Sequence, residues 1–184
     1  MSKLVRFYLL LGAIAFAFSM GVTAPTIDIW FISHVSKEIY AASCAIETAV
    51  MALALSALGM EKVRQWGRKW FAILLILDVL FFIALNTIGQ DAVAVRFLGM
   101  AVAMSFTSTF LYTIMDSVIN RNIAGDDLTG FQAKLNAARM WSALAGGTLA
   151  VVGTFTVTEA LIVQTLGYIV YALTDYFVFS RLQA

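Results

Sequence analysis

Acidic side chains inside long apolar segments are the residues of this sequence best suited to chemistry. Asp78 lies near the middle of the apolar segment 70–88, and Glu47 lies about a third of the way into the segment 41–59. A carboxylate at the centre of a membrane-spanning helix costs about 3 kcal/mol by insertion scales, so it normally faces a bundle interior, a cavity or a partner. Each carboxyl is therefore a candidate for proton exchange or substrate contact. The alternative is a neutral or paired carboxyl that locks helix packing.

Arg96 is a third candidate, near the start of another apolar segment at 93–117. Its guanidinium can contact a substrate, or it can snorkel to the headgroups while its aliphatic stem stays in lipid. Five further charged residues fall toward the other ends of the predicted helices: Arg64, Arg68, Asp116, Arg139 and Asp175. They can form one charge network, or they can remain a solvated interfacial cluster.

Catalytic and metal-binding patterns are missing from the sequence. The single histidine, His34, and the single cysteine, Cys44, fall in different regions and cannot build a zinc site together. The sequence has no Gly-rich phosphate loop, serine elbow or acid pair at catalytic spacing. We therefore expect no enzyme activity, no cofactor and no metal, and we interpret Cys44 as a small packing residue.

The segments that must position these residues are long and apolar. The chain of 184 residues is 61% hydrophobic and 12% charged, with a mean hydropathy of +0.89, whereas soluble domains are about half apolar and a quarter charged. Six apolar segments each reach the roughly 20 residues that a helix needs to cross a bilayer. They cover residues 5–32, 41–59, 70–88, 93–117, 134–156 and 160–180. Because lipid offers no partner for unpaired backbone groups, we predict an all-α membrane protein with six transmembrane helices in a single domain, residues 1–184.

The first segment also has features of a signal peptide, since Lys3 and Arg6 precede an apolar run. Its small-residue site at 22–24 is followed by Pro25, which hinders cleavage, and the apolar run continues to Ile32. We therefore expect an uncleaved first helix.

Cations are distributed unevenly between the two ends of the predicted helices. If the N-terminus is inside, only Lys37 and Arg96 of the 12 Lys and Arg residues fall outside. The cytoplasmic cations are Lys3, Arg6, Lys62, Arg64, Arg68, Lys69, Arg121, Lys134, Arg139 and Arg181. This asymmetry follows the positive-inside rule, so we expect both termini in the cytoplasm and a multi-pass protein of the bacterial inner membrane. The net charge of +1 gives no indication of a nucleic-acid partner.

A basic loop between the second and third predicted helices carries a family pattern. It reads Gly59-Met60-Glu61-Lys62-Val63-Arg64-Gln65-Trp66-Gly67-Arg68-Lys69. This loop, with Gly21 and Pro25 in the first predicted helix, resembles the N-terminal half of major facilitator superfamily transporters. The residues that match the family loop are Gly59, Arg64, Gly67, Arg68 and Lys69, whereas Val63 stands where the family has an Asp.

Two partial matches lie further along the chain. Residues 96–99 read Arg-Phe-Leu-Gly, which is similar to the start of the family's fourth helix. Small residues on the fifth predicted helix, among them Gly146, Gly147 and Gly153, resemble the family's glycine-rich stretch. Small residues allow helices to approach closely in lipid, so these glycines predict a tight helix contact, with a hinge as the alternative.

The resemblance implies a half bundle with a 3+3 inverted repeat and a gate network on the cytoplasmic side. It also implies transport of a small solute by alternating access, with Arg96 at a position where antiporters of the family place an arginine. Full members pair two six-helix halves related by an axis along the membrane normal. Two copies of this chain, or one copy with another membrane subunit, are therefore expected to form the complete arrangement.

Two functions follow from these patterns. The first is a half-transporter that works as a dimer, with proton coupling through Glu47 or Asp78. The second is a non-transporting scaffold or accessory subunit of a larger membrane complex, an alternative that the missing family Asp at Val63 favours. The two differ in what surrounds the buried charges: a water-accessible cavity for a transporter, and static pairs for a scaffold.

Overall fold

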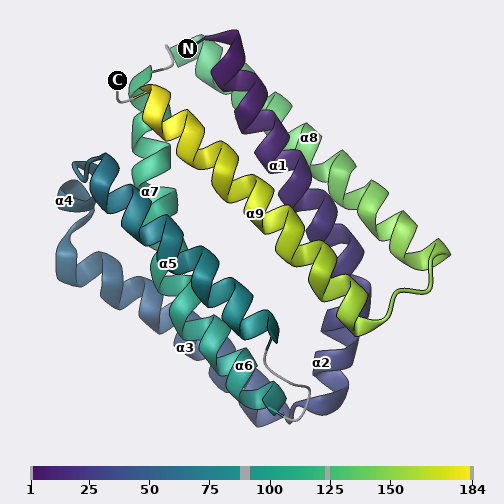
Figure 1. Cartoon of the computed structure of the whole chain (residues 1–184). Helices are drawn as coiled ribbons and strands as arrows, with labels where there is room; N and C mark the ends of the chain where they lie inside the picture. Colours follow the sequence, from purple (N-terminus) through teal and green to yellow (C-terminus); the bar gives the residue numbers. More distant parts are fainter. Residues whose placement is uncertain (1, 88–91, 123–124, 183–184) are drawn as a thin grey trace. The chain divides into compact units, whose positions relative to one another are not determined.

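The computed structural model describes residues 2–87, 92–122 and 125–182, and its regular structure in these ranges is helical, without a strand. This confirms the predicted all-α class. In chain order the elements are α1 (Lys3–Thr23), η1 (Ala24–Asp28), α2 (Ile29–His34), α3 (Lys37–Leu58), α4 (Met60–Arg64), α5 (Arg68–Thr87), α6 (Val93–Gly99), η3 (Met100–Met104), α7 (Ser105–Asn122), α8 (Gly125–Val152) and α9 (Val157–Leu182) (Figure 1). The segments η1 and η3 are single stretches of π-helix inside longer helical runs.

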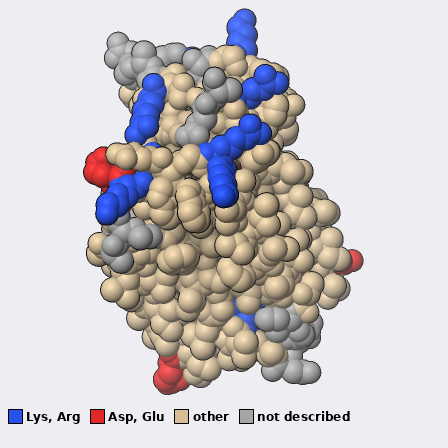
Figure 2. All heavy atoms as spheres, turned by 60° about the vertical axis from the view of Figure 1, so that its left-hand side comes forward, with Lys and Arg blue, Asp and Glu red and all other residues tan. Residues whose placement is uncertain are grey.

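Four helical runs within the described ranges are long and apolar enough to cross a membrane. They are Lys3–Ile27, Arg68–Thr87, Val93–Asn122 and Val157–Leu182. Large apolar side chains also remain on the surface, and Val151 and Val152 are each 81% exposed. The face drawn in Figure 2 is covered mainly by uncharged residues. Because such a surface suits hydrocarbon and not water, the chain is a multi-pass integral membrane protein.

The six predicted spans are thus matched by four. The other two long helices, α3 and α8, are not among these four runs. The bounds predicted for the fifth helix, 134–156, also differ from those of α8, which begins at Gly125 and ends at Val152. Helices can project beyond the lipid into water, which allows the polar residues before 134 to remain helical. The N–H of Gly153 closes the last turn on the carbonyl of Leu149 at 2.7 Å.

The first predicted segment passes through Pro25 by a local change of helix type. Proline lacks an N–H and its ring crowds the carbonyl four residues earlier, which normally breaks or kinks an α-helix. Here Pro25 lies in η1, and helical structure continues through α2 to His34. A single π-helical turn widens the backbone at the proline, so the chain remains helical across it.

The chain forms two compact units. The first unit contains residues 1–30 and 118–184, and the second contains residues 31–117. In the first unit α1 packs along both α8 and α9 (Figure 1). In the second unit η3 packs against α3 and α5, and α6 packs against α3. Each unit therefore joins one long helix from one half of the chain to two consecutive long helices from the other half.

Small residues allow the close approach of α1 and α9 in the first unit. A Cβ atom on Gly167 would lie 2.9 Å from the carbonyl oxygen of Ala15, and a Cβ atom on Gly12 would lie 3.2 Å from Cβ of Thr174. Aromatic rings fill the space beside this contact, with Phe16 at 5.2 Å from Tyr171 between ring centroids. Close van der Waals packing of this kind is what holds helices together when lipid removes the hydrophobic driving force.

Large apolar side chains form the core of the second unit. The fully buried ones include Phe71, Phe110 and Ile114. Trp66, from the loop before α5, lies 5.5 Å from Phe110 and 5.6 Å from Trp70 between ring centroids. These aromatic contacts attach the basic loop to the start of α5.

Candidate functional site

Asp78 lies on the buried face of α5. Apolar residues on the same helix face are buried one turn before and after it, at Leu74, Leu75 and Phe82. This 3.6-residue period places Asp78 toward the core of its unit, where it is only 1% exposed. The sequence therefore positions a carboxyl at a place that the surrounding pattern reserves for an apolar side chain.

Thr107 on α7 is the hydrogen-bond partner of this carboxyl. Its hydroxyl is 2% exposed and donates to Oδ1 of Asp78. The same hydroxyl lies 2.9 Å from the carbonyl oxygen of Ala103 in η3. The second carboxyl oxygen, Oδ2 of Asp78, is buried and has no hydrogen-bond partner among the described residues. A buried polar atom in this state is costly, and a water molecule or an ion can supply the missing partner.

Arg96 is buried and does not snorkel out of its unit. Its side chain is on α6, is 2% exposed, and donates from Nη2 to Oδ1 of Asn86 at 2.7 Å. Asn86 is eight residues beyond Asp78 on α5, which corresponds to about 12 Å along the helix axis. Arg96 and Asp78 thus belong to one unit but occupy different levels of it.

Glu47 lies apart from these two residues. It is exposed on α3, next to exposed Cys44 and Thr48, whereas Ser43 and Ala54 are the buried positions among the α3 side chains that the structure describes. Within its unit, Glu47 therefore does not face the core. An exposed carboxyl in the middle of an apolar helix still needs water or a partner when the helix crosses lipid.

The basic loop has a defined backbone. Gly59 adopts a φ of 71°, in the left-handed region, and begins the short helix α4. Within α4, Arg64 Nη1 lies 3.2 Å from Oε1 of Glu61. Val63 is fully buried. The acid that pairs with Arg64 is therefore Glu61.

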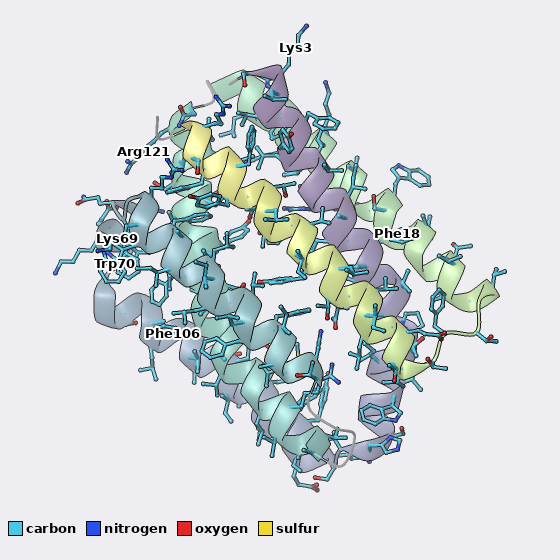
Figure 3. The ribbon with its side chains drawn as sticks, viewed as in Figure 1. Lys3, Phe18, Lys69, Trp70, Phe106 and Arg121 are labelled. Carbon is cyan, nitrogen blue, oxygen red and sulfur yellow. The ribbon has the colours of Figure 1, made fainter. Side chains whose placement is uncertain are left out.

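The remaining loop glycine and cations extend this surface. A Cβ on Gly67 would meet open space, and Arg68 and Lys69 are exposed at the start of α5. Lys69 and Trp70 project from the same end of that helix (Figure 3). A basic loop with an adjacent tryptophan matches the composition of a membrane–water interface.

The predicted charge network is divided between the two units. In the first unit Asp175 on α9 is 7% exposed and interacts with the hydroxyl of Tyr171 and the charge of Arg139 on α8. In the second unit Asp116 is half-buried on α7. The structure thus pairs Arg64 with Glu61 and places Asp175 within the electrostatic influence of Arg139.

The three glycines predicted on the fifth helix occupy different surroundings. Gly146 faces the backbone of α1, where an added Cβ would lie 2.9 Å from the nitrogen of Val22. For Gly147 the nearest atom to such a Cβ is the carbonyl oxygen of Gly21 at 3.8 Å. Gly153 lies just after the end of α8, against Phe155. Gly146 is therefore the residue of the three that requires glycine for a helix contact.

Sequence reasoning missed the polar partners of the buried charges. Thr107 and Asn86 hold Asp78 and Arg96. Gln164 on α9 is also buried, and its Nε2 donates to the sulfur of Met20 at 3.4 Å. All three are uncharged polar residues inside apolar segments, and that pattern was the signal that could have identified them.

The described residues contain no group of three His, Cys, Asp or Glu side chains that could hold a metal ion. Comparison with protein-family models, curated proteins and solved structures found no match to this chain. The fold and the buried charges define a class: a helical, multi-pass integral membrane protein.

Proposed function

We propose that this chain is a half-sized membrane transport protein. Two copies, or one copy with another membrane subunit, move a small solute by alternating access, and Asp78 couples that movement to protons. The observation that carries the proposal is the carboxyl of Asp78, which is buried in a candidate span. One of its oxygens accepts from a hydroxyl, and the other has no hydrogen-bond partner among the residues that the structure describes.

A carboxyl that serves only packing is expected to have all of its oxygens hydrogen-bonded. Leaving a buried acceptor without a partner costs about 1–3 kcal/mol, and more when the group is charged. Asp78 retains such an acceptor within a candidate span. Ionisable groups that are retained at such a cost in membrane helices commonly serve ion or proton pathways.

The arrangement of helices agrees with the proposed six-span half bundle. With 22 residues in α3 and 28 in α8, these helices are roughly 33 and 42 Å long, enough to cross about 30 Å of hydrocarbon. The first long helix packs on the last two, and the fourth packs on the second and third. In both units the first helix of one triplet thus packs on the second and third helices of the other triplet. A 3+3 repeat predicts this arrangement, because the first helix of each triplet then makes equivalent contacts.

The exposed position of Glu47 supports the proposal that a second subunit binds this chain. Its carboxyl is exposed on α3 and has apolar or small neighbours along that helix. In a bilayer this carboxyl requires either a water-filled cavity or another polypeptide. A dimer in which α3 faces the space between two copies supplies both.

A membrane scaffold or accessory subunit is the second candidate function. The observation that favours it is the hydrogen bond that holds buried Arg96 to Asn86. Such a bond can lock helices in one arrangement, as a static subunit requires. The two functions therefore make opposite predictions about flux.

The test combines mass measurement with flux. The protein is purified in a mild detergent, its mass is measured, and it is reconstituted into liposomes that contain a pH-sensitive dye. A panel of amino acids, sugars and organic cations is then added with and without a pH gradient. If the protein is a transporter, we expect the mass of a dimer or of a defined complex. We also expect that addition of at least one solute causes protons to cross the liposome membrane.

Three outcomes bear on the proposal. A monomer without flux, or a protein that co-purifies with unrelated subunits and moves no solute, contradicts transport and supports the scaffold. Flux that survives Asp78→Asn and Glu47→Gln together contradicts proton coupling and leaves transport standing. Loss of proton movement in Asp78→Asn supports the complete proposal.

A further inference from the structure

The hydroxyl of Thr107 lies between two acceptors. One is Oδ1 of Asp78 on α5, and the other is the carbonyl oxygen of Ala103, one turn earlier on its own helical run. A threonine hydroxyl has one hydrogen to donate and two lone pairs that accept. It can therefore donate fully to only one of these acceptors at a time.

The protonation state of Asp78 decides which acceptor receives that hydrogen. An ionised carboxylate can only accept, so the Thr107 hydroxyl must turn toward it, and the carbonyl of Ala103 loses its side-chain donor. A protonated carboxyl is itself a donor. It can donate to the hydroxyl oxygen of Thr107, and the hydroxyl is then free to donate to Ala103 over the observed 2.9 Å.

The carbonyl of Ala103 lies at a junction in the backbone. Ala103 belongs to the π-helical segment η3, and α7 begins two residues later at Ser105. A threonine that bonds to the carbonyl four residues earlier often bends its helix. Short π-helical segments are frequent at functional sites. A hydrogen bond that is present in one protonation state only therefore changes the backbone at this junction.

We propose that Asp78, Thr107 and Ala103 form a proton-binding site in which uptake of one proton by Asp78 transfers the Thr107 hydrogen bond from the carboxylate to the carbonyl of Ala103. The proton comes from water and adds to a carboxylate oxygen, and no other covalent bond changes except this O–H bond. The inference deepens the proposed function, on which its role in coupling rests, by adding a mechanism through which the proton alters a helix.

The charged groups around the site are distant from Asp78 along their helices. On α5, Arg68 precedes Asp78 by ten residues, or about 15 Å. On α7, Asp116 follows Thr107 by nine residues, or about 14 Å. Arg96 on α6 binds Asn86, which lies about 12 Å from Asp78 along the axis of α5. Glu47 on α3 is exposed, and η3 contains only apolar residues. A proton on Asp78 is therefore the main change of charge at this site.

The experiment uses the full chain in lipid nanodiscs and two signals. Infrared difference spectra report the C=O band of a protonated carboxyl, and NMR of ¹³C-methyl-labelled alanine reports the surroundings of Ala103. For the wild type we expect the carboxyl band and the Ala103 methyl resonance to change with pH at one common midpoint. In Asp78→Asn, both changes are expected to be lost.

Variants at position 107 separate the hydroxyl from the carboxyl. In Thr107→Val the carboxyl band is expected to persist at a shifted frequency, whereas the pH response of the Ala103 methyl disappears. Thr107→Ser restores that response. The matched control is Thr113→Val, since Thr113 also bonds to the carbonyl four residues earlier, at 2.8 Å, but lies six residues beyond Thr107 on α7. This control is expected to retain the wild-type response.

The proposal is overturned if the Ala103 methyl still responds to pH in Thr107→Val. It is also overturned if the wild type shows no protonated carboxyl band that depends on Asp78. A third contradicting result is a response that Na⁺ reproduces at constant pH, because carboxyl, hydroxyl and carbonyl oxygens also suit a hard cation. The titration does not require flux. A normal titration without solute movement therefore contradicts only the proposed transport, and solute movement without the titration contradicts only this inference.

Discussion

Gly21 on α1 and Gly146 on α8 bring two helix backbones into direct contact. A Cβ on Gly146 would lie 2.9 Å from the backbone nitrogen of Val22, and a Cβ on Gly21 would lie 3.0 Å from Cα of Ala143. Real Cβ atoms essentially never come closer than about 3.0 Å to another heavy atom, so neither position accepts a side chain without moving a helix. The first unit thus depends on glycine at this crossing.

The contact predicts a difference between two adjacent glycines. Gly146→Ala is expected to destabilise the protein by about 1–3 kcal/mol, because overpacking forces backbone shifts. Gly147→Ala is the matched control, since the nearest atom to its added Cβ is 3.8 Å away. The midpoint of thermal unfolding in detergent measures both. Equal midpoints for the two variants would contradict the close approach of α1 and α8.

The bond between Arg96 and Asn86 predicts a loss of stability when the amide is removed. Asn86→Leu removes a hydrogen bond to a charged donor, worth about 1.5–3 kcal/mol. Thr87→Val provides a control on the same helix, because that hydroxyl donates to the carbonyl of Ala84 and not to another helix. A thermal midpoint for Asn86→Leu that equals the midpoint of Thr87→Val would show that this bond does not hold α5 to α6.

The backbone of Gly59 predicts a third effect. With a φ of 71°, an L side chain at this position costs about 1–2 kcal/mol. Gly59→Ala is therefore expected to lower the thermal midpoint, whereas Gly67→Ala, where a Cβ meets open space, is expected to have little effect. The opposite order would contradict the turn assigned to the start of α4.

Thr156 and Glu159 form a reciprocal cap at the start of α9. The N–H of Thr156 donates to Oε2 of Glu159 at 2.8 Å, and the N–H of Glu159 donates to the hydroxyl of Thr156 at 3.3 Å. Thr156→Ala is expected to cost about 1 kcal/mol, as loss of an N-cap usually does. Hydrogen exchange of the first turn of α9 measures the effect, with Thr154→Ala as control. Unchanged protection in Thr156→Ala would contradict the cap.

Hydrophobic segment length was sufficient to predict the helical class, because segments of about 20 apolar residues have few other structures open to them in lipid. It was not sufficient to predict the ends of α8, since polar residues next to a span can continue a helix in water. The π-helical turn at Pro25 also lay beyond the sequence pattern, because a proline allows either a break or a change of helix type.

The candidate site was predictable only in part. Asp78 was identified from its charge within an apolar segment. Its partner Thr107 lies 29 residues away in the chain, and pairing them requires the relative rotation of two helices, which periodicity alone does not give. For the same reason the burial of Arg96 and the exposure of Glu47 could not be assigned, since both depend on which face of a helix meets its neighbour.

The central claim is that Asp78 couples solute movement to protons. The most direct measurement compares wild type and Asp78→Asn in liposomes for two processes: accumulation of a solute driven by a pH gradient, and exchange of the same solute without a gradient. We expect Asp78→Asn to lose gradient-driven accumulation and to retain exchange, because the conformational cycle remains but the proton site is gone. Accumulation by Asp78→Asn at the wild-type level would contradict the account.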